Sequence, residues 1–512
     1  MLQALRSLLH ILLGLSLLAA LGMAGEPIHL VILHTNDVHG QVLPRRAHWI
    51  EDREAWVGGL PRVAAYANQV RAELDGVNEA LLLVDAGDWF QGTPEGSIEG
   101  GRRFVRAMAS VGYDAMCVGN HEFDLGLGNL RGVLHSAQPP AVLANVVVPG
   151  TGRTLGGVQP WVLVRKAGLR IALVGLLSPS TPSITHPDAR QLEFRDPAQV
   201  LGECVEALAG KADLIVPLTH LGIEHDIELA RAHPGLPLIV GGHSHTFLRE
   251  PLMEGETAIV QAGSKAGAVG RIDLWIDPRT HDIQRLEARL VDLYDEPEER
   301  WRSRAVELVC GRLARASSAL QDEVVGELAL AAERGSDYRS SPAGNWIADS
   351  MRRVGEADVA VHNRGGIRRA LPAGPITRRM LFEMLPFSNT VVLLELTGAE
   401  LRQALRNAIE DNEHSGVEVS GMRVEVRVDE SGHGRLERVW VGEGLLDDEA
   451  TYRLATNSFL ARGGDAYFAH LGEPDTLDSG VLLRECLEQA FLEQPTQTPA
   501  TDDRYRVLEG DA

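Results

Sequence analysis

The first half of the chain carries metal-binding residue types at intervals, each at or shortly after the end of a short apolar run. Carboxylate, amide and imidazole groups form a mixed oxygen and nitrogen ligand set, which suits zinc, manganese or iron better than calcium. None of the candidates is a cysteine, which argues against a soft thiolate site. The candidate ligands are Asp37, His39, Asp88, Asn120, His220, His243 and His245. This pattern predicts two divalent metal ions of open identity.

The spacing of these residues suggests how they grip two ions. Asp37 and His39 are two positions apart, so an extended strand would point both side chains to one face, and His243 and His245 repeat that spacing. Asp88 has two carboxylate oxygens and can bridge the ions. Two cations roughly 3.5 to 4 Å apart polarise a phosphoryl oxygen and turn a bound water into hydroxide. The chemistry predicted is therefore phosphate-ester hydrolysis.

A candidate catalytic pair follows the ligand Asn120. We expect His121 to face the reacting phosphate rather than a metal, with Asp124 holding its imidazole in the protonated form. Such a pair would stabilise charge on the transition state or on the leaving oxygen. As an alternative, Asp124 could cap a helix over residues 125–134.

The apolar runs that precede the candidate ligands are typical of buried parallel strands. They cover residues 28–33, 81–84, 115–118, 214–218 and 236–240. An α/β sheet binds its ligands beyond the carboxyl ends of such strands. We therefore expect an α/β domain whose function lies where these strands end.

At 512 residues the chain is too long for one ordinary core. An apolar N-terminal segment followed by small residues predicts a signal peptide over residues 1–25, with an uncleaved anchor as the alternative. We expect a first domain over 26–295, a linking helix over 296–322 and an α+β domain over 323–512. The signal predicts a periplasmic or secreted protein with no stable membrane insertion after cleavage.

The formal net charge of -22 argues against a nucleic-acid polymer as partner, because such binding needs a basic surface. The four cysteines are too scattered for a metal motif or a dense disulfide framework. Bound cations must therefore attract any phosphate substrate. The sequence leaves the oligomeric state open.

The second half carries a separate set of polar and aromatic residues near paired glycines. Arginines suit a phosphate, an aromatic face suits a base, and a carboxylate suits sugar hydroxyls. The set comprises Arg339, Asn363, Arg368, Phe459 and Asp465. It predicts a nucleotide pocket, with the alternative that the arginines are solvated and the phenylalanine belongs to a core.

Five motifs have the order and spacing of the calcineurin-like metallophosphoesterase signature. They are Asp37-Val38-His39, Gly87 to Gly92, Gly119 to Asp124, His220, and Gly241 to His245. Together with the second half, they make the chain resemble the secreted bacterial 5'-nucleotidase and UDP-sugar hydrolase family. The resemblance implies a four-layer α/β/β/α metallophosphoesterase sandwich, joined by a linking helix to a smaller α+β substrate-binding domain.

The resemblance also implies roles. One metal would be held by Asp37, His39, Asp88 and His245, and the other by Asp88, Asn120, His220 and His243. The second-domain set would bind the phosphate, base and ribose of the substrate.

Three residues depart from the family pattern. His245 stands where Gln or Asn is common, Gly416 where an aromatic residue often stacks on the base, and Arg364 where glycine is usual. Loss of one stacking face would cost about 1 kcal/mol of base affinity. Arg364 could add phosphate affinity or crowd its loop.

The leading prediction is a metal-dependent enzyme that removes the 5'-phosphate of extracellular nucleotides, with nucleotide sugars, di- and triphosphates or cyclic nucleotides as further candidate substrates. Metal-activated hydroxide would attack phosphorus in line with the leaving oxygen. One alternative is hydrolysis of a sulfur ester, as in the related thiosulfohydrolases, which His245 and Gly416 favour and Phe459 and Asp465 oppose. The other is a non-catalytic nucleotide-binding protein, against which the complete ligand set argues.

Overall fold

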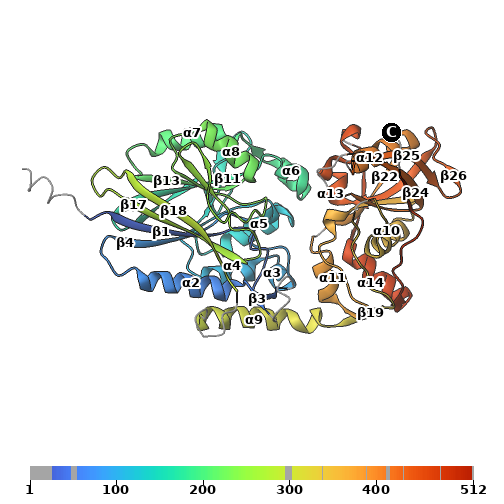
Figure 1. Cartoon of the computed structure of the whole chain (residues 1–512), viewed down its shortest axis with the longest axis horizontal. Coiled ribbons are helices and arrows are strands. Elements are labelled where there is room, and N and C mark those ends of the chain that lie inside the picture. The colour runs from blue at the N-terminus through green and yellow to red at the C-terminus, as the bar shows by residue number, and fades with distance from the viewer. Residues whose placement is uncertain are drawn as a thin grey trace, which may run out of the picture.

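The chain forms two bodies joined by helix α9 (Arg304–Gln321) (Figure 1). The computed structural model describes residues 26–47, 55–294, 303–336, 338–387, 389–410, 416–430, 432–472 and 474–509. The expected signal peptide over residues 1–25 lies outside these ranges. Within them, no helix combines the length and apolar character needed to span a membrane.

The first domain contains two large sheets. The strand order in the first is β18 (Ile283–Asp292), β17 (Ala268–Ile276), β1 (Ile28–Thr35), β4 (Glu79–Asp85), β5 (Ala115–Cys117), β6 (Ala141–Val142) and β9 (Val158–Gln159). The order in the second is β10 (Trp161–Lys166), β11 (Leu169–Leu177), β13 (Leu214–His220), β14 (Leu238–Val240), β16 (Thr257–Val260) and β15 (Leu252–Glu254). The five predicted strands are therefore confirmed as β1, β4, β5, β13 and β14.

Alternation along β1 shows how the sheets are layered. Leu30 and Ile32 point into a core shared with the second sheet, whereas Val31 and Leu33 point to the helices on the other side. Those helices are α2 (Leu60–Glu73), α4 (Arg102–Ala109) and α5 (Gly126–Ser136), while α7 (Pro197–Leu208) and α8 (Ile223–Ala232) cover the second sheet. The domain is the expected four-layer α/β/β/α sandwich.

Strand direction decides where the site lies. β1, β4 and β5 are mutually parallel, as are β11, β13 and β14. In Figure 1, strand β1 runs toward the second domain. The carboxyl ends of the strands parallel to it therefore face that domain.

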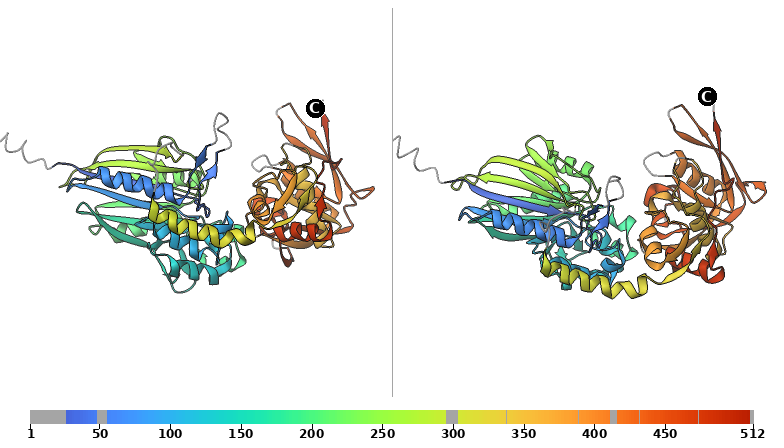
Figure 2. Two further views of the ribbon diagram at one scale, coloured as in Figure 1. Left: turned by 90° about the horizontal axis from the view of Figure 1, so that it is seen from below. Right: turned by 60° about the horizontal axis from the view of Figure 1, so that its bottom comes forward.

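Helix α9 packs mainly on the first domain, along α2, α3 (Pro94–Ser97) and α4, and reaches α11 (Arg378–Met384) of the second (Figure 2). Ser317 of α9 donates a hydrogen bond to Glu95 of α3 at 3.0 Å. Arg379 of α11 forms ion pairs with Glu95 and with Asp322, the C-cap of α9. Residues 295–302, which include the predicted start of the linking helix, lie outside the described ranges.

The second domain is built on a five-stranded sheet. Its order is β23 (Val417–Ser420), β20 (Val359–Asn363), β27 (Thr451–Asn457), β22 (Thr390–Thr397) and β28 (Leu477–Leu482). Val392 and Leu394 of β22 pack with α12 (Gly398–Glu410), whereas Val391 and Leu393 pack with α10 (Pro342–Val354) and α14 (Leu483–Glu493). A four-stranded sheet orders β26 (Gly444–Leu445), β25 (Gly434–Val441), β24 (Met422–Val428) and β30 (Tyr505–Glu509). The α+β expectation is confirmed.

Candidate active site

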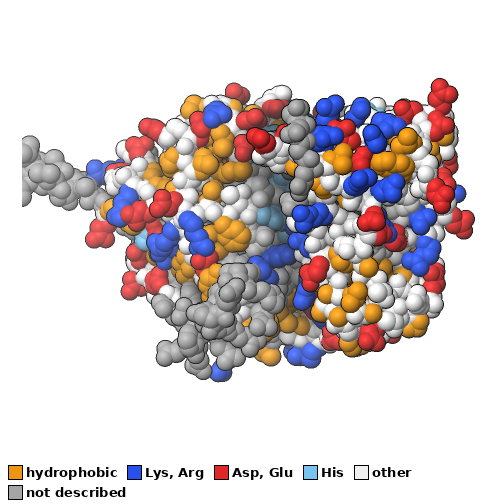
Figure 3. All heavy atoms as spheres, turned by 45° about the vertical axis from the view of Figure 1, so that its right-hand side comes forward, with side chains coloured by type: hydrophobic (Ala, Val, Ile, Leu, Met, Phe, Trp, Pro, Cys, Tyr) orange, Lys and Arg blue, Asp and Glu red, His pale blue; other side chains and the backbone are white. Residues whose placement is uncertain are grey.

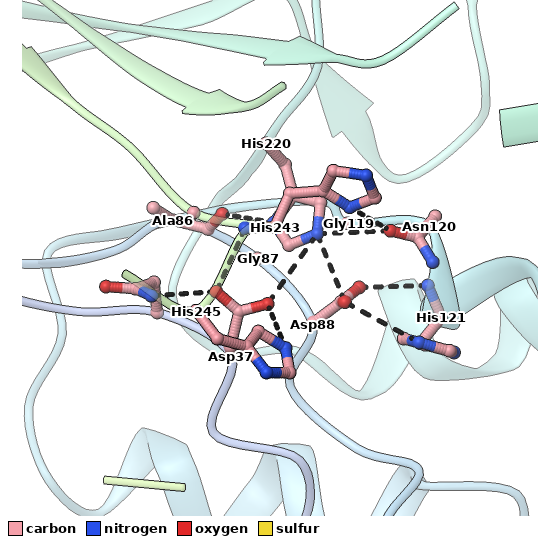
Figure 4. A network of polar contacts seen from close by, with 12 residues as sticks. Asp37, Ala86, Gly87, Asp88, Gly119, Asn120, His121, His220, His243 and His245 are labelled. Carbon is pink, nitrogen blue, oxygen red and sulfur yellow. Dashed lines mark hydrogen bonds and ion pairs between the residues drawn. The ribbon is translucent and has the colours of Figure 1, made fainter. Parts of the chain in front are cut away.

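The seven candidate ligands meet at the carboxyl edge of the two facing sheets. Figure 4 shows the side chains of Asp37, Asp88, Asn120 and His220 pointing toward one another. Asp37 and His39 follow β1, Asp88 follows β4, Asn120 follows β5, His220 ends β13, and His243 and His245 follow β14. Both sheets thus contribute donor atoms to one place.

The first group of donors consists of Asp37, His39 and His245. The Nε2 atoms of His39 and His245 lie 3.0 Å apart, and Asp37 Oδ1 lies 3.2 Å from His245 Nε2 and 3.9 Å from His39 Nε2. Asp37 is fully buried, yet its Oδ1 makes no hydrogen bond with any residue that the structure describes. A buried oxygen without a hydrogen bond, approached by two imidazole nitrogens, is the arrangement expected of ligands around a cation.

The second group consists of Asp88, Asn120, His220 and His243. His220 Nε2 lies 3.1 Å from Asp88 Oδ2 and 3.2 Å from Asn120 Oδ1, and His243 Nδ1 lies 2.9 Å from the same Asn120 oxygen. Candidate metal-binding groups of donors form at Asp37, His39 and His245, at Asp88, His220 and His243, and between them at His39, Asp88 and His121. These carboxylate, amide and imidazole donors fit two adjacent divalent cations.

The backbone at these ligands differs from our expectation. Five of them have positive φ values, namely Asp37 (50°), His39 (48°), Asp88 (58°), His243 (78°) and His245 (55°). Strand β1 ends at Thr35 and β14 at Val240, so the proposed extended arrangement is wrong. The ligands converge because of left-handed turns, each of which costs about 1 kcal/mol or more. Asp, Asn and His are the non-glycine residues that adopt this conformation most readily.

Backbone carbonyls orient two of the imidazoles. The Nδ1 atoms of His220 and His39 lie 2.8 Å from the Ala86 oxygen and 2.9 Å from the Gln91 oxygen. These contacts favour a proton on Nδ1 and leave Nε2 facing the other ligands. Burial lowers the pKa of His220, but the charges of Asp88 and Asp37 outweigh it and raise the pKa to about 10. A cation that binds here must displace that proton.

Glu122 is a supporting residue to which sequence reasoning gave no role. Its buried carboxylate accepts hydrogen bonds from the backbone N–H groups of Gly119 at 2.7 Å, Trp89 at 2.8 Å and Asp88 at 3.1 Å. It thereby ties the loop after β4 to the loop after β5. Burial, then the charge of Asp88, raises the pKa of Glu122 to about 8. The sequence did offer one signal for Glu122, because it directly follows His121 in the motif Gly119 to Asp124.

The predicted contact between His121 and Asp124 forms. His121 Nδ1 lies 2.6 Å from Asp124 Oδ2, and Thr185 donates a hydrogen bond to Asp124 Oδ1 at 3.0 Å. The N-cap of α5 is Leu125, so Asp124 does not hold the capping position considered above. Burial lowers the pKa of His121, but the charges of Asp124 and Asp88 raise it to about 10. The pair can present a protonated imidazole beside the metal ligands.

Phe387 of the second domain also reaches this site, which no sequence pattern indicated. Its ring stacks on that of His121, with centroids 5.7 Å apart and an interplanar angle of 16°. The guanidinium carbon of Arg368 lies 5.7 Å from the same ring. Nearby, Arg462 donates a hydrogen bond to the Thr185 carbonyl at 3.1 Å. The contacts of Phe387 with His121 and of Arg462 with Thr185 join the two domains, so only the docking of the domains reveals them.

The candidate substrate residues of the second domain are less tightly joined. Asn363 Nδ2 donates to Asp465 Oδ2 at 2.8 Å, and Asp465 has a left-handed φ of 51°. The ring of half-buried Phe459 packs against Gly464, where an added Cβ would lie 2.5 Å from the ring. Arg339 and Arg368 are exposed. The structure thus brings Asn363, Asp465 and Phe459 together, whereas Arg339 and Arg368 have exposed side chains and Arg368 lies near Phe387.

Two of the departures from the family pattern are neighbours. Arg364 is buried and donates through Nε to Glu418 at 2.8 Å and through Nη2 to the Arg339 carbonyl. A Cβ at Gly416 would lie 3.3 Å from Arg364 Nη1. The charge of Arg364 is therefore balanced inside the domain, and its guanidinium lies beside Gly416.

Comparisons with known proteins agree with this architecture. Residues 30–247 match the calcineurin-like phosphoesterase family, and residues 322–473 match the 5'-nucleotidase C-terminal domain. Protein UshA of Yersinia enterocolitica is 30% identical over 511 residues, which cover 90% of each chain. The chain belongs to the UshA and 5'-nucleotidase family. It is a metallophosphoesterase of the 5'-nucleotidase type, as the sequence predicted.

Solved structures place the chain in the same family. The 5'-nucleotidase precursor from Thermus thermophilus is 31% identical, with a TM-score of 0.78, covering 94% of this chain and 100% of that one. The sulfate thiohydrolase SoxB from Thermus thermophilus has a TM-score of 0.71 at 18% identity, covering 94% of this chain and 97% of that one. That second likeness shows a shared fold and carries no statement about the reaction.

Proposed function

We propose that the protein is an exported 5'-nucleotidase that hydrolyses the phosphate ester of small-molecule nucleotides with two divalent cations, zinc or manganese being suitable. The observation that carries this proposal is the pair of adjacent donor groups, with His121 and Asp124 beside them and Phe387 of the second domain, which lies near Arg368, stacked on His121. Family membership agrees with the reaction class.

The roles of the first domain follow from its contacts. Asp37, His39 and His245 would hold one cation, and Asn120, His220 and His243 the other, with Asp88 between them. When bound, the cations would supply Lewis acidity and lower the pKa of water. His121, held by Asp124, would donate a hydrogen bond or a proton to the departing oxygen.

The second domain would hold the rest of the nucleotide. Arg339 and Arg368 carry charge toward solvent and would bind phosphate. Phe459 would stack on the base, and the Asn363 and Asp465 pair would bind sugar hydroxyls. This division leaves the chemistry in one domain and most of the specificity in the other.

Export is proposed from the N-terminal segment. Residues 1–25 contain an apolar stretch preceded by Arg6 and followed by small residues, which is the composition of a secretory signal. A periplasmic or secreted enzyme would meet nucleotides outside the cell.

The decisive experiment uses metal-stripped mature protein with manganese or zinc restored. Phosphate or nitrophenol release is measured from AMP, UDP-glucose, cyclic 2',3'-AMP and bis-p-nitrophenyl phosphate, for wild type, His121→Ala and the control His225→Ala. His225 is an exposed histidine on α8. We expect metal-dependent release from AMP that collapses only in His121→Ala. Release from the generic diester alone would refute the nucleotide assignment, and tight AMP binding without turnover would favour a binding protein.

A further inference from the structure

One side of the four-stranded sheet in the second domain is packed and the other faces outward. Val424 and Val426 of β24 pack into the core with α12, so strand alternation turns the residues between them to the opposite side. Residues paired across neighbouring strands share a face. The strand register therefore gives the outer side three rows, namely Leu445, Trp440 and Arg423, then Arg438, Glu425 and Arg506, then Arg435, Arg427 and Leu508. We call these residues the arginine face.

Carboxylates balance only some of the arginines on this face. Glu425 lies between two of them, with Arg438 Nε at 3.8 Å and Arg506 Nη1 at 3.5 Å. Glu437 lies at the bulge in β25, and its exposed carboxylate accepts a hydrogen bond from Arg427 Nε at 3.0 Å. Five guanidinium groups against two carboxylates leave an excess of three positive charges.

The other two arginines of the face, Arg423 and Arg435, are exposed and make no ion pair with any residue that the structure describes. Further acidic residues near β25, namely Asp429, Glu430 and Glu443, lie in the turns at its two ends and not on the strands. The positive face stands out in a chain whose formal net charge is -22. Such a local excess of one sign calls for an anionic partner.

Apolar side chains lie among these charges. Leu445 of strand β26 is 64% exposed and is paired with Trp440 in the first row. The guanidinium carbon of Arg423 lies 4.6 Å from the centroid of the Trp440 ring. Half-buried Leu508 ends the third row. Arginine combined with tryptophan and leucine suits a surface that rests at the boundary between lipid headgroups and acyl chains.

The position of the arginine face favours a flat partner. Strands β24, β25 and β26 lie at the end of the second domain away from the first (Figure 1). Figure 3 turns this end forward and shows Lys and Arg side chains beside hydrophobic ones on the upper part of the second domain. Forces between exposed charges fade over about 8 Å at physiological salt. A flat anionic surface at this end therefore meets the arginines first, whereas a flexible nucleic-acid polymer would also meet the acidic remainder of the chain.

We infer that the arginine face docks the protein on a membrane surface rich in anionic phospholipid. The guanidinium groups would bind lipid phosphates, and Leu445 and Trp440 would enter the headgroup layer. The contact is peripheral, and it leaves the metal-binding edge, on the side toward the first domain, accessible to nucleotides. The inference goes beyond the proposed hydrolysis, because it concerns where the enzyme acts.

The first test measures sedimentation of the mature protein with vesicles of phosphatidylcholine alone or of equal parts phosphatidylcholine and phosphatidylglycerol, after dialysis removes unbound divalent cations. We expect binding to the anionic vesicles only, weakened as salt rises. Arg423→Gln combined with Arg435→Gln should lower the affinity roughly twentyfold, since each arginine at such a surface contributes about fivefold. The paired lysine substitutions keep the charge and most of the binding, and the exposed control Arg279→Gln in the first domain equals wild type.

Equal binding to both kinds of vesicle, or an unchanged affinity in the double glutamine variant, would overturn the inference. Retention on immobilised heparin without binding to either vesicle would overturn the lipid assignment in favour of an anionic polymer. The assay involves no nucleotide, so its result is independent of whether the proposed nucleotidase activity is found.

The second test uses the wild-type protein alone. Phenylglyoxal modifies exposed arginines, and mass spectrometry maps the modified positions with and without the anionic vesicles. We expect the vesicles to protect Arg423, Arg435 and Arg438 and to leave Arg279 reactive. Unchanged reactivity at the arginine face, or protection only elsewhere on the chain, would overturn this face as the docking surface.

Discussion

The metal-binding edge of the first domain and the candidate nucleotide pocket of the second are built in opposite ways. At the first, buried side chains contact one another at hydrogen-bonding distances and left-handed turns fix their backbone. At the second, Asn363 donates a hydrogen bond to Asp465, while Arg339 and Arg368 are exposed. A preorganised centre spends no energy on rearrangement during the reaction. Changes at the first region should therefore reduce kcat, and changes at the second should raise KM.

The largest effect is expected at Asp88, the carboxylate between the two donor groups. Asp88→Asn removes a negative charge that both cations would share, so we expect kcat for AMP to fall by roughly ten-thousandfold or more. Metal content is measured by plasma emission spectrometry after dialysis. The exposed Asp282→Asn serves as control. Retention of both metals and of activity would contradict the assigned bridge.

His121→Ala tests chemistry without loss of metal, and we expect kcat to fall by roughly a thousandfold at normal metal content.

The charge of Asp124 helps to raise the pKa of His121 to about 10, so the protonated form persists through neutral pH and is lost as pH rises. Asp124→Asn removes that charge and should move the alkaline limb of the rate profile to lower pH. The pH dependence of kcat for both proteins checks this, and an unmoved limb would exclude the pair.

The interior of the second domain should prove as tightly held as the metal edge. Glu418→Gln leaves the buried guanidinium of Arg364 without its counter-charge, which we expect to cost about 3 kcal/mol of unfolding free energy. Denaturant unfolding measures it. The matched control is Glu437→Gln, which breaks the more exposed pair with Arg427 and should cost no more than about 1 kcal/mol. Equal effects would show that burial does not distinguish the two pairs.

The smallest effect is expected at the base. Phe459→Leu keeps an apolar side chain but loses the flat stacking face, so we expect KM for AMP to rise roughly fivefold, equivalent to about 1 kcal/mol, with kcat unchanged. Turnover of bis-p-nitrophenyl phosphate, which lacks a nucleoside, is the internal control. A matching loss on both substrates would mean that Phe459 supports the fold rather than the base.

The sequence indicated the metal edge well because each ligand lies at or just beyond the end of an apolar strand. The same rule failed on backbone shape, since Asp37 and His39 converge through left-handed turns that strand alternation does not describe. Phe387 was missed because its contact with His121 depends on how the two domains dock. Sequence reasoning also did not predict that the Arg364 side chain points into the domain, because that orientation depends on Glu418 and on the space beside Gly416.

The left-handed ligand positions also bear on how such a site evolves. Few residue types both tolerate that backbone and bind a divalent cation, chiefly Asp, Asn and His. In the genetic code these three differ only in the first base of their codons. A single point mutation can therefore exchange an oxygen donor for a nitrogen donor at Asp37, His243 or His245 without passing through a residue that the turn rejects. Metal preference can therefore change at these positions without an intermediate that has lost a ligand. One base change converts the His245 codon to an asparagine codon.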